Sequence, residues 1–366
     1  MIPLFKIHTD QDDIDMVTGT IKRGSHWAIG PNIETFEKML AEYIGTRYAL
    51  TFNSGTSALH SLLLAYDIGR GDEVIVPSFT FIATANAPLF VGAKPVFADI
   101  ERQTFGLDPE DVERKITPKT KAIIPINYAG CPCQIEELKA IADRHNVLLF
   151  EDAAEAFGAE VGGQKVGSFG DSSVLSFCAN KIITTGEGGA VVTNSTDIYV
   201  KLKLIRSHGR ADTMDYFSNT EVSDYVQLGY NFRMSDITAA LGIAQLRKVD
   251  WIIRRRRNNS YLLTDKLLNI KEVQPPMPMP NPPVFQMYTI LTNNRDKLQS
   301  FLKDKGIMSK VYFSPVHQTT FYKKYKVSLP VTEGISNQVL TLPMYPDLTE
   351  DEIGYITDCI KEFYGE

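Results

Sequence analysis

The stretch SSVLSFCANKIITTGEGGAVVTN, residues 172–194, indicates the kind of fold and site that this chain forms. It consists of a β-rich run, a polar loop that carries Lys181, a glycine-rich turn and a second β-rich run. A single lysine in a loop is usually a solvated surface charge. Here Ser176 precedes the lysine by five residues, and Asp152 ends the preceding apolar run. An amine, a phosphate ligand and an anion for a ring nitrogen are what a pyridoxal phosphate site needs.

Apolar runs alternate with helix-like segments on the N-terminal side of this stretch. The runs are residues 73–78, 94–100, 121–127 and 146–152, and the segments between them are Ala83–Val91, Asp108–Lys115 and Ile135–His145. This alternation is typical of an α/β fold with a parallel sheet covered on both faces. Sites in such sheets form at the carboxyl ends of the strands. Several candidate residues follow predicted strand ends, namely Phe81, Asn127, Asp152, Glu155, Ser176 and Lys181.

A turn of small polar residues, Asn53–Thr56, precedes a helix predicted at Ser57–Ala65. Free N–H groups and the helix dipole at such a helix start favour a phosphate group. A plain helix cap is the alternative, because these residue types cap helices often.

The length of 366 residues predicts two domains. We expect a large domain at residues 1–245 and a smaller C-terminal α+β domain at residues 246–366. A polar loop is predicted at 208–223, and one long helix from about Ser235 to beyond Arg256. The second domain would contain a proline-rich connection at 275–283, strands at 284–292 and 309–315, and helices at 295–305 and 350–363.

Composition excludes several other classes of protein. The net charge of -6 argues against a general nucleic-acid binder. No signal peptide and no membrane-spanning apolar run are visible, so we expect a cytoplasmic protein with no membrane contact. The four cysteines fit neither a disulfide framework nor a common zinc pattern, and we expect no metal site.

Five motifs resemble the DegT/DnrJ/EryC1/StrS sugar aminotransferases, which are fold-type I pyridoxal phosphate enzymes. The motifs are SGTSAL (54–59), GDEVIVPSFTFIAT (71–84), EDAAEAFGA (151–159), SFCANKIITTGEGGAVVTN (176–194) and GYNFRMSDITAA (229–240). The resemblance implies a large domain with a mostly parallel seven-stranded sheet between helices. It also implies pyridoxal 5'-phosphate (PLP) as cofactor and a homodimer with shared active sites.

The resemblance assigns roles to single residues. Lys181 would bind the cofactor covalently and move the proton between carbon and cofactor, and Asp152 would bind the ring nitrogen. The other implied cofactor contacts are Phe81 and Ala154 on the two ring faces, Glu155 near the ring hydroxyl, Gly55, Thr56 and Ser176 on the phosphate, and Asn231 on the phosphate of the neighbouring subunit's cofactor.

The resemblance also implies a reaction. Relatives that dehydrate sugars carry histidine in place of Lys181, so this lysine indicates transamination. The expected reaction moves the amino group of L-glutamate to carbon 4 of a nucleotide-linked 4-keto-6-deoxyhexose. The alternatives are amination at carbon 3 or of another ketosugar, and a non-catalytic regulatory homologue.

Three residues are expected to contact the sugar: Trp27, Asn127 and His317. Trp27 could equally belong to the core, and His317 could be an exposed loop histidine. Many relatives have histidine where Asn127 stands, and an aromatic residue or histidine where Cys178 stands. We expect both differences to change the sugar pocket rather than the cofactor chemistry.

Overall fold

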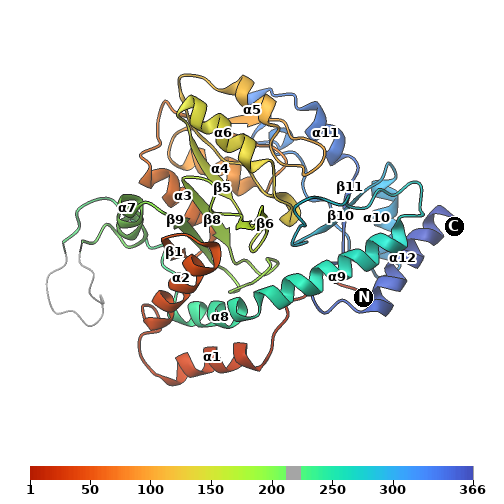
Figure 1. The fold of residues 1–366 in the computed structure, drawn as a ribbon, viewed down its shortest axis with the longest axis horizontal. Coiled ribbons are helices and arrows are strands. Elements are labelled where there is room, and N and C mark those ends of the chain that lie inside the picture. Colours follow the sequence, from red (N-terminus) through yellow and green to blue (C-terminus); the bar gives the residue numbers. More distant parts are fainter. Residues whose placement is uncertain (212–223, 366) are drawn as a thin grey trace.

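The computed structural model describes residues 1–211 and 224–365, so part of the predicted loop at 208–223 lies outside the described residues. The chain forms a part built on a large sheet and a second part built on a small one (Figure 1). The elements of the first part are α1 (Gln11–Lys22), α2 (Pro31–Ile44), β1 (Tyr48–Phe52), α3 (Gly55–Ala65), β2 (Glu73–Pro77), α4 (Ile82–Phe90), β3 (Lys94–Ala98), α5 (Pro109–Lys115), β4 (Thr120–Ile123), α6 (Ile135–His145), β5 (Leu148–Asp152), β6 (Glu160–Val161), β7 (Gln164–Lys165), β8 (Ser172–Ser176), β9 (Gly189–Thr193), α7 (Thr196–Arg206) and α8 (Asp236–Arg247).

The large sheet has seven strands in the order β1-β9-β8-β5-β4-β2-β3. Strand β9 is antiparallel to both of its neighbours, and the pairs from β8 to β3 are parallel. Successive strand residues face opposite sides, as Leu149 and Phe150 do when they join different hydrophobic clusters. Helices α2, α6 and α8 pack on one face, and α3, α4 and α7 on the other. The predicted fold-type I α/β architecture, with a mostly parallel seven-stranded sheet between helices, is confirmed.

The carboxyl ends of the parallel strands lie along one edge of the sheet. Strand β5 ends at Asp152 and β8 at Ser176. Strand β4 is shorter than predicted and ends at Ile123, two residues before Pro125, which has no N–H to donate. Pairing resumes at an isolated bridge between Ile126 and Asp152, so the loop after β4 still runs beside the end of β5.

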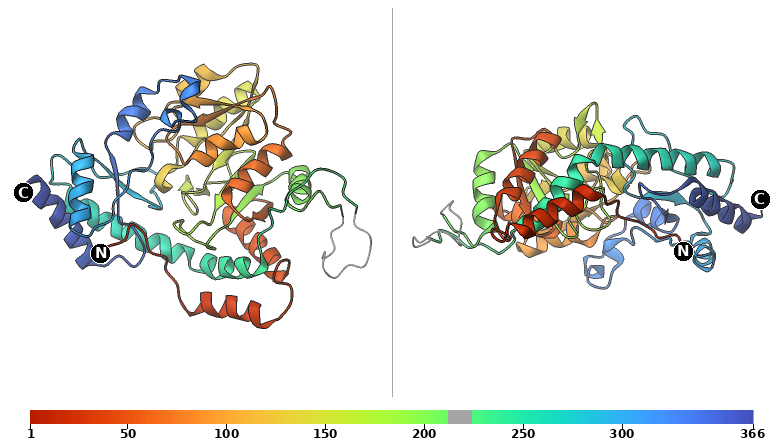
Figure 2. Two further views of the ribbon diagram at one scale, coloured as in Figure 1. Left: turned by 180° about the vertical axis from the view of Figure 1, so that it is seen from behind. Right: turned by 90° about the horizontal axis from the view of Figure 1, so that it is seen from below.

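The second part contains α9 (Val249–Leu267), β10 (Tyr288–Leu291), α10 (Arg295–Asp304), α11 (Pro330–Ser336), β11 (Val339–Leu342) and α12 (Glu350–Tyr364). Strands β10 and β11 pair antiparallel, and a hydrophobic cluster joins them to α9, α10 and α12. Helix α9 runs from the large sheet to this part, and both chain termini lie there (Figure 2). Segment 316–329 packs back on the α3 face of the large sheet through Val316, Tyr322 and Leu329.

Several predicted elements of the second part are wrong in detail. The single long helix is two helices, because Lys248 leaves helical geometry at φ -108° and ψ 6° between α8 and α9. No strand forms at 309–315, where only Lys310 makes a bridge, to Thr341. The predicted strand at 284–292 is reduced to β10, and β11 was not predicted. The division at residues 245 and 246 stays a proposal.

Candidate active site

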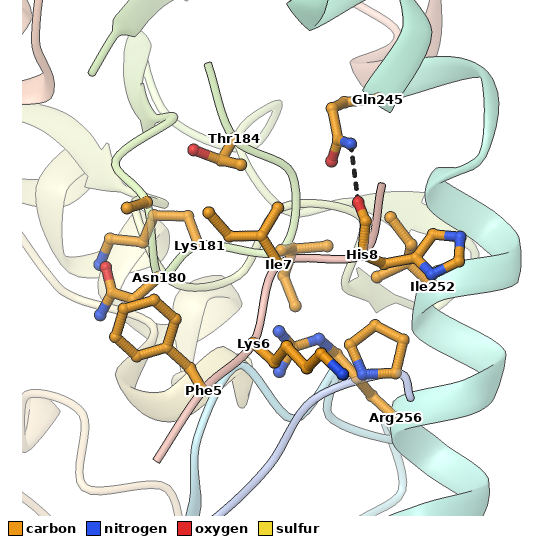
Figure 3. A pocket seen from close by; sticks show the side chains of 13 residues that line it. Phe5, Lys6, Ile7, His8, Asn180, Lys181, Thr184, Gln245, Ile252 and Arg256 are labelled. Carbon is orange, nitrogen blue, oxygen red and sulfur yellow. Dashed lines mark hydrogen bonds between the residues drawn. The ribbon is translucent and has the colours of Figure 1, made fainter. Parts of the chain in front are cut away.

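Lys181 lies in the loop between β8 and β9, directly beyond the carboxyl end of β8. Its side chain is only 13% exposed, and its Nζ lies 3.6 Å from Oε1 of Glu155. The Lys181 N–H donates to the carbonyl of Cys178 at 3.0 Å, which fixes the loop beside the strand end. Figure 3 shows the lysine next to Asn180, among the residues that line a small cavity. The lysine is therefore held inside the fold rather than on its surface.

Asp152 is a buried carboxylate at the end of β5. Its Oδ2 accepts a hydrogen bond from the Thr84 hydroxyl at 2.8 Å, and its Oδ1 accepts one from the Ala154 N–H at 3.2 Å. Burial raises the pKa of Asp152, while the Thr84 hydrogen bond acts in the opposite direction. The side chain is thus fixed from two sides and is available to a cationic ring nitrogen.

Glu155 is a second buried carboxylate, between the lysine loop and the loop after β4. Its Oε2 accepts a hydrogen bond from the Ala129 N–H at 2.9 Å, and its Oε1 faces Lys181. Burial raises the pKa of Glu155, and the nearby ammonium group of Lys181 opposes this shift.

The start of α3 forms a cradle of backbone N–H groups beside Ser176. Ser54 caps the helix, and its oxygens accept the N–H groups of Ser57 and Ala58. Within residues 1–211 and 224–365, the N–H groups of Gly55 and Thr56 donate to no acceptor. A Cβ atom at Gly55 would lie 3.1 Å from Cβ of Ser176, so a side chain there would crowd the cradle. Free N–H groups at a helix start next to a hydroxyl group suit a phosphate.

These groups fit pyridoxal phosphate. The cradle offers donors for a phosphate, Asp152 offers an anion for the ring nitrogen, and Lys181 offers an amine for the aldehyde. The buried Nδ2 of Asn127 has no partner in the described part of the chain. A buried donor without a partner is costly unless a bound group accepts from it.

Comparison with known families gives a match to the DegT/DnrJ/EryC1/StrS aminotransferase family over residues 8–361. The chain belongs to this family. GDP-perosamine synthase of Caulobacter vibrioides is 40% identical over 343 residues, which cover 92% of this chain and 91% of that protein. The pleiotropic regulatory protein of Geobacillus stearothermophilus is 36% identical, with 96% of this chain and 94% of that protein covered.

A solved structure agrees with this assignment over the whole chain. The structure of S. venezuelae DesV in complex with a ketimine intermediate has a TM-score of 0.92 and 31% identity, covering 100% of this chain and 99% of DesV. The family and its structural neighbours are PLP-dependent sugar aminotransferases. This DegT/DnrJ/EryC1/StrS protein is therefore an aminotransferase, and the predicted membership of the family is confirmed.

The predicted site residues of this family member fall into three groups. The structure brings most of the predicted cofactor residues to one edge of the sheet: Gly55, Thr56, Asp152, Ala154, Glu155, Ser176 and Lys181. Three others are surface residues, with Phe81 58% and Trp27 48% exposed and Asn231 also exposed. Asn53 Nδ2 donates to the Asn231 carbonyl at 3.5 Å, and the role of Asn231 toward a neighbouring subunit stays a prediction.

Two predicted sugar contacts lie inside the protein. Oδ1 of Asn127 accepts the Cys133 N–H at 2.9 Å, so only its amide nitrogen is left without a partner in the described chain. His317 is buried, with Nδ1 2.7 Å from the Ser78 hydroxyl and Nε2 3.2 Å from Glu333. The alternative that His317 is an exposed loop histidine is therefore wrong, and its contact with a sugar stays a prediction.

Sequence reasoning missed Thr84 and the backbone of Ala129, which bind the two buried carboxylates. Thr84 ends the motif at 71–84, but nothing in the motif shows that it faces Asp152. Ala129 adopts the left-handed conformation at φ 56°, which points its N–H toward Glu155. A non-glycine residue in this conformation has no clear sequence signal.

No helix in the described part of the chain is both long and apolar enough to cross a membrane.

Proposed function

We propose that the protein transfers the amino group of L-glutamate to carbon 4 of a nucleotide-linked 4-keto-6-deoxyhexose, with PLP as cofactor. The observation that carries this proposal is the largely enclosed Lys181 beside Glu155, at the same sheet edge as Asp152 and the N-terminal cradle of α3. The 40% identity to a GDP-perosamine synthase supports a GDP-linked sugar, although other nucleotides fit the same proposal.

Each residue has a defined task in this proposal. When bound, PLP supplies an aldehyde and a protonated ring that withdraws electrons from the reacting carbon. The Lys181 amine would bind the aldehyde and then carry the proton to and from that carbon. Asp152 would keep the ring nitrogen protonated. The N–H groups of Gly55 and Thr56 and the hydroxyl of Ser176 would hold the phosphate.

Two exposed aromatic side chains support a shared site in a homodimer. Phe81 stands at the cap of α4 beside the site, and a ring-stacking role requires that it be shielded from water. We propose that the second subunit covers Phe81 and Trp27, and that its Asn231 reaches the cofactor phosphate.

The test is incubation of the purified protein with L-glutamate and a panel of GDP-, UDP- and dTDP-linked ketosugars. NMR of the product locates the new amine, and we expect it at carbon 4. An amine at carbon 3 would replace this proposal by the alternative reaction.

The name of the G. stearothermophilus relative favours a second candidate, a regulatory role. The presence of Lys181, Asp152 and Ser176 together supports catalysis instead. A protein that stays colourless when PLP is added would favour the regulatory candidate.

A further inference from the structure

The segment 284–287 of the second part forms backbone hydrogen bonds with the loop that holds Glu155. Its first and last N–H groups donate to the carbonyls of Gly130 and Ala129, at 3.0 and 3.4 Å. The N–H of Ala129 in turn donates to Glu155. The packing here is tight, because a Cβ atom at Gly130 would lie 3.1 Å from the nitrogen of Gln286. Movement of the segment would therefore move the donor that holds Glu155.

The same segment also holds the lysine loop, through the side chain of Gln286. This side chain is buried, and its Nε2 donates to the carbonyl of Asn180 at 2.9 Å. Asn180 directly precedes Lys181. The amide oxygen of Gln286 accepts from no donor in the described chain, so among these residues the side chain is hydrogen-bonded to the lysine loop alone. One segment thus contacts both the loop that carries Lys181 and the loop whose Ala129 N–H binds Glu155.

Arg256 of α9 fixes the segment from its other side. Its Nη1 lies within hydrogen-bond distance of the carbonyls of Phe285, Gln286 and Met344, at 3.0, 3.3 and 3.2 Å. The side chain is buried, and among residues 1–211 and 224–365 it has no carboxylate partner. Burial lowers the pKa of Arg256 to about 10. Figure 3 shows Arg256 at the same small cavity as Asn180 and Lys181.

Burying an arginine without a carboxylate partner lowers the stability of the folded chain, since only carbonyl dipoles replace the water around the charged group. A methionine of similar volume would fill the same space without that cost. Packing alone therefore does not explain why a cation is at this position. Its three carbonyl partners explain it, because two of them belong to the segment that touches both loops of the site.

We propose that Arg256 and Gln286, both in the second part of the chain, are positioning residues that fix Lys181 and Glu155 relative to each other. Arg256 fixes segment 284–287, and Gln286 transmits that position to the lysine loop. The inference rests on the proposed role of Lys181, and it adds two residues to which the family resemblance gave no role.

The test compares Gln286→Met with the matched control Gln299→Met. Gln299 also donates its side-chain amide to a backbone carbonyl, that of Ser309 at 3.2 Å, but it lies on α10 away from the site. In the protein without added cofactor, the rate of acylation of Lys181 by an amine-reactive reagent is followed by mass spectrometry. Lys248 is the internal reference, because its side chain is 11% exposed and paired with acidic residues.

We expect Gln286→Met to raise the acylation rate of Lys181 about fivefold, the factor that corresponds to one lost hydrogen bond. Lys248 in the same variant, and both lysines in Gln299→Met, should keep their parental rates. If Lys181 and Lys248 accelerate together, the effect is general destabilisation and the proposal is overturned. If neither changes, the proposal is overturned as well.

Arg256→Lys tests the second residue, with Arg255→Lys as its control. A lysine keeps the positive charge but replaces the rigid planar guanidinium by a flexible ammonium group, so we expect the fold to be retained while the segment loosens. We expect faster acylation of Lys181 and a lower rate of the glutamate half-reaction at unchanged glutamate KM. Equal behaviour of Arg256→Lys and Arg255→Lys would overturn the role of Arg256.

Failure of the proposed function is detected separately. Borohydride reduction of the loaded protein followed by peptide mapping shows whether the cofactor is attached at Lys181. A label elsewhere refutes the role of Lys181, whereas the acylation rates of the cofactor-free protein test the positioning alone.

Discussion

The hydrogen bond from Thr84 to Asp152 offers a sharp test of how the buried carboxylate is maintained. Thr84 gives its single hydroxyl proton to Oδ2 of Asp152 at 2.8 Å. The Thr80 hydroxyl lies 2.9 Å from the Thr84 hydroxyl, and it must supply the proton of that second bond. Both threonines are 1% exposed. Thr84→Val therefore removes one donor from the carboxylate and leaves the shape of the side chain nearly unchanged.

A hydrogen bond to a charged group contributes about 1.5–3 kcal/mol, which corresponds to a factor of about ten to 150 in rate or affinity. The Ala154 N–H remains as the other donor to Asp152, so the loss should lie near the lower end of this range. The bond also lowers a pKa that burial raises. Without it the pKa of Asp152 rises further, and the carboxylate takes up a proton at a higher pH. The acid side of the activity profile should therefore shift to higher pH in Thr84→Val.

The assay is the glutamate half-reaction, followed by the absorbance of the bound cofactor in a stopped-flow instrument between pH 5 and 9. Thr80→Val is the matched control, because it removes a buried hydroxyl whose bond joins two neutral groups and contributes about 0.5–1.5 kcal/mol. We expect a clear loss of rate for Thr84→Val that is largest at low pH, and a smaller loss without a shift for Thr80→Val. Superimposable profiles for the two variants would refute the reasoning.

Three further predictions concern the charged and polar groups of the site. Lys181→Ala should abolish turnover while circular dichroism and size-exclusion chromatography show an unchanged fold and dimer, since the side chain stands in a loop and forms one ion pair within the described part of the chain. Amino sugar made at the parental rate would disprove the assignment. Asn231→Ala should weaken PLP binding without unfolding the subunit, and an unchanged Kd in a cofactor titration would contradict the cross-subunit contact. Burial raises the pKa of Glu155 above its usual 4.5, so the folded chain binds this proton more tightly than the unfolded chain does. The resulting stability is full below pH 4.5 and is lost as the pH rises through the folded pKa. In urea unfolding of the cofactor-free protein, the free energy of unfolding of Glu155→Gln should therefore rise relative to that of the parent as the pH rises from 4.5. A difference between the two that stays constant with pH would contradict this prediction.

The sheet and the position of Lys181 could be predicted because their signals are local. Asp152 ends an apolar run of strand length, and Ser176 ends the next one, so both belong at the same edge of a parallel sheet. The helix start at Gly55 is also a local signal, since Ser54 and Ser57 form a capping box. These features need no information about distant partners.

The errors in the second part have non-local causes. Residues 309–315 have the composition of a strand, but Lys310 alone pairs with Thr341, and the Tyr312 carbonyl accepts the hydroxyl of Tyr128 instead. Residues 284–287 extend an apolar run, yet the N–H groups of Val284 and Met287 bind the loop after β4 rather than β11. In both cases the hydrogen-bonding partner of the segment determines whether a strand forms. A single sequence does not show which partner lies nearest in space.

Among the residues that the structure describes, the two buried carboxylates of the site share one nearby cation, and this imbalance connects folding to cofactor binding. Lys181 can neutralise Glu155 or Asp152 but not both, and burial raises the pKa of each carboxyl group. A protonated ring nitrogen at Asp152 would supply the missing positive charge to a carboxylate that is shielded from water. Because a ligand that binds only the folded chain stabilises it by mass action, we expect PLP to raise the unfolding temperature. The part of that gain due to charge should disappear in Asp152→Asn, which leaves one carboxylate facing one lysine.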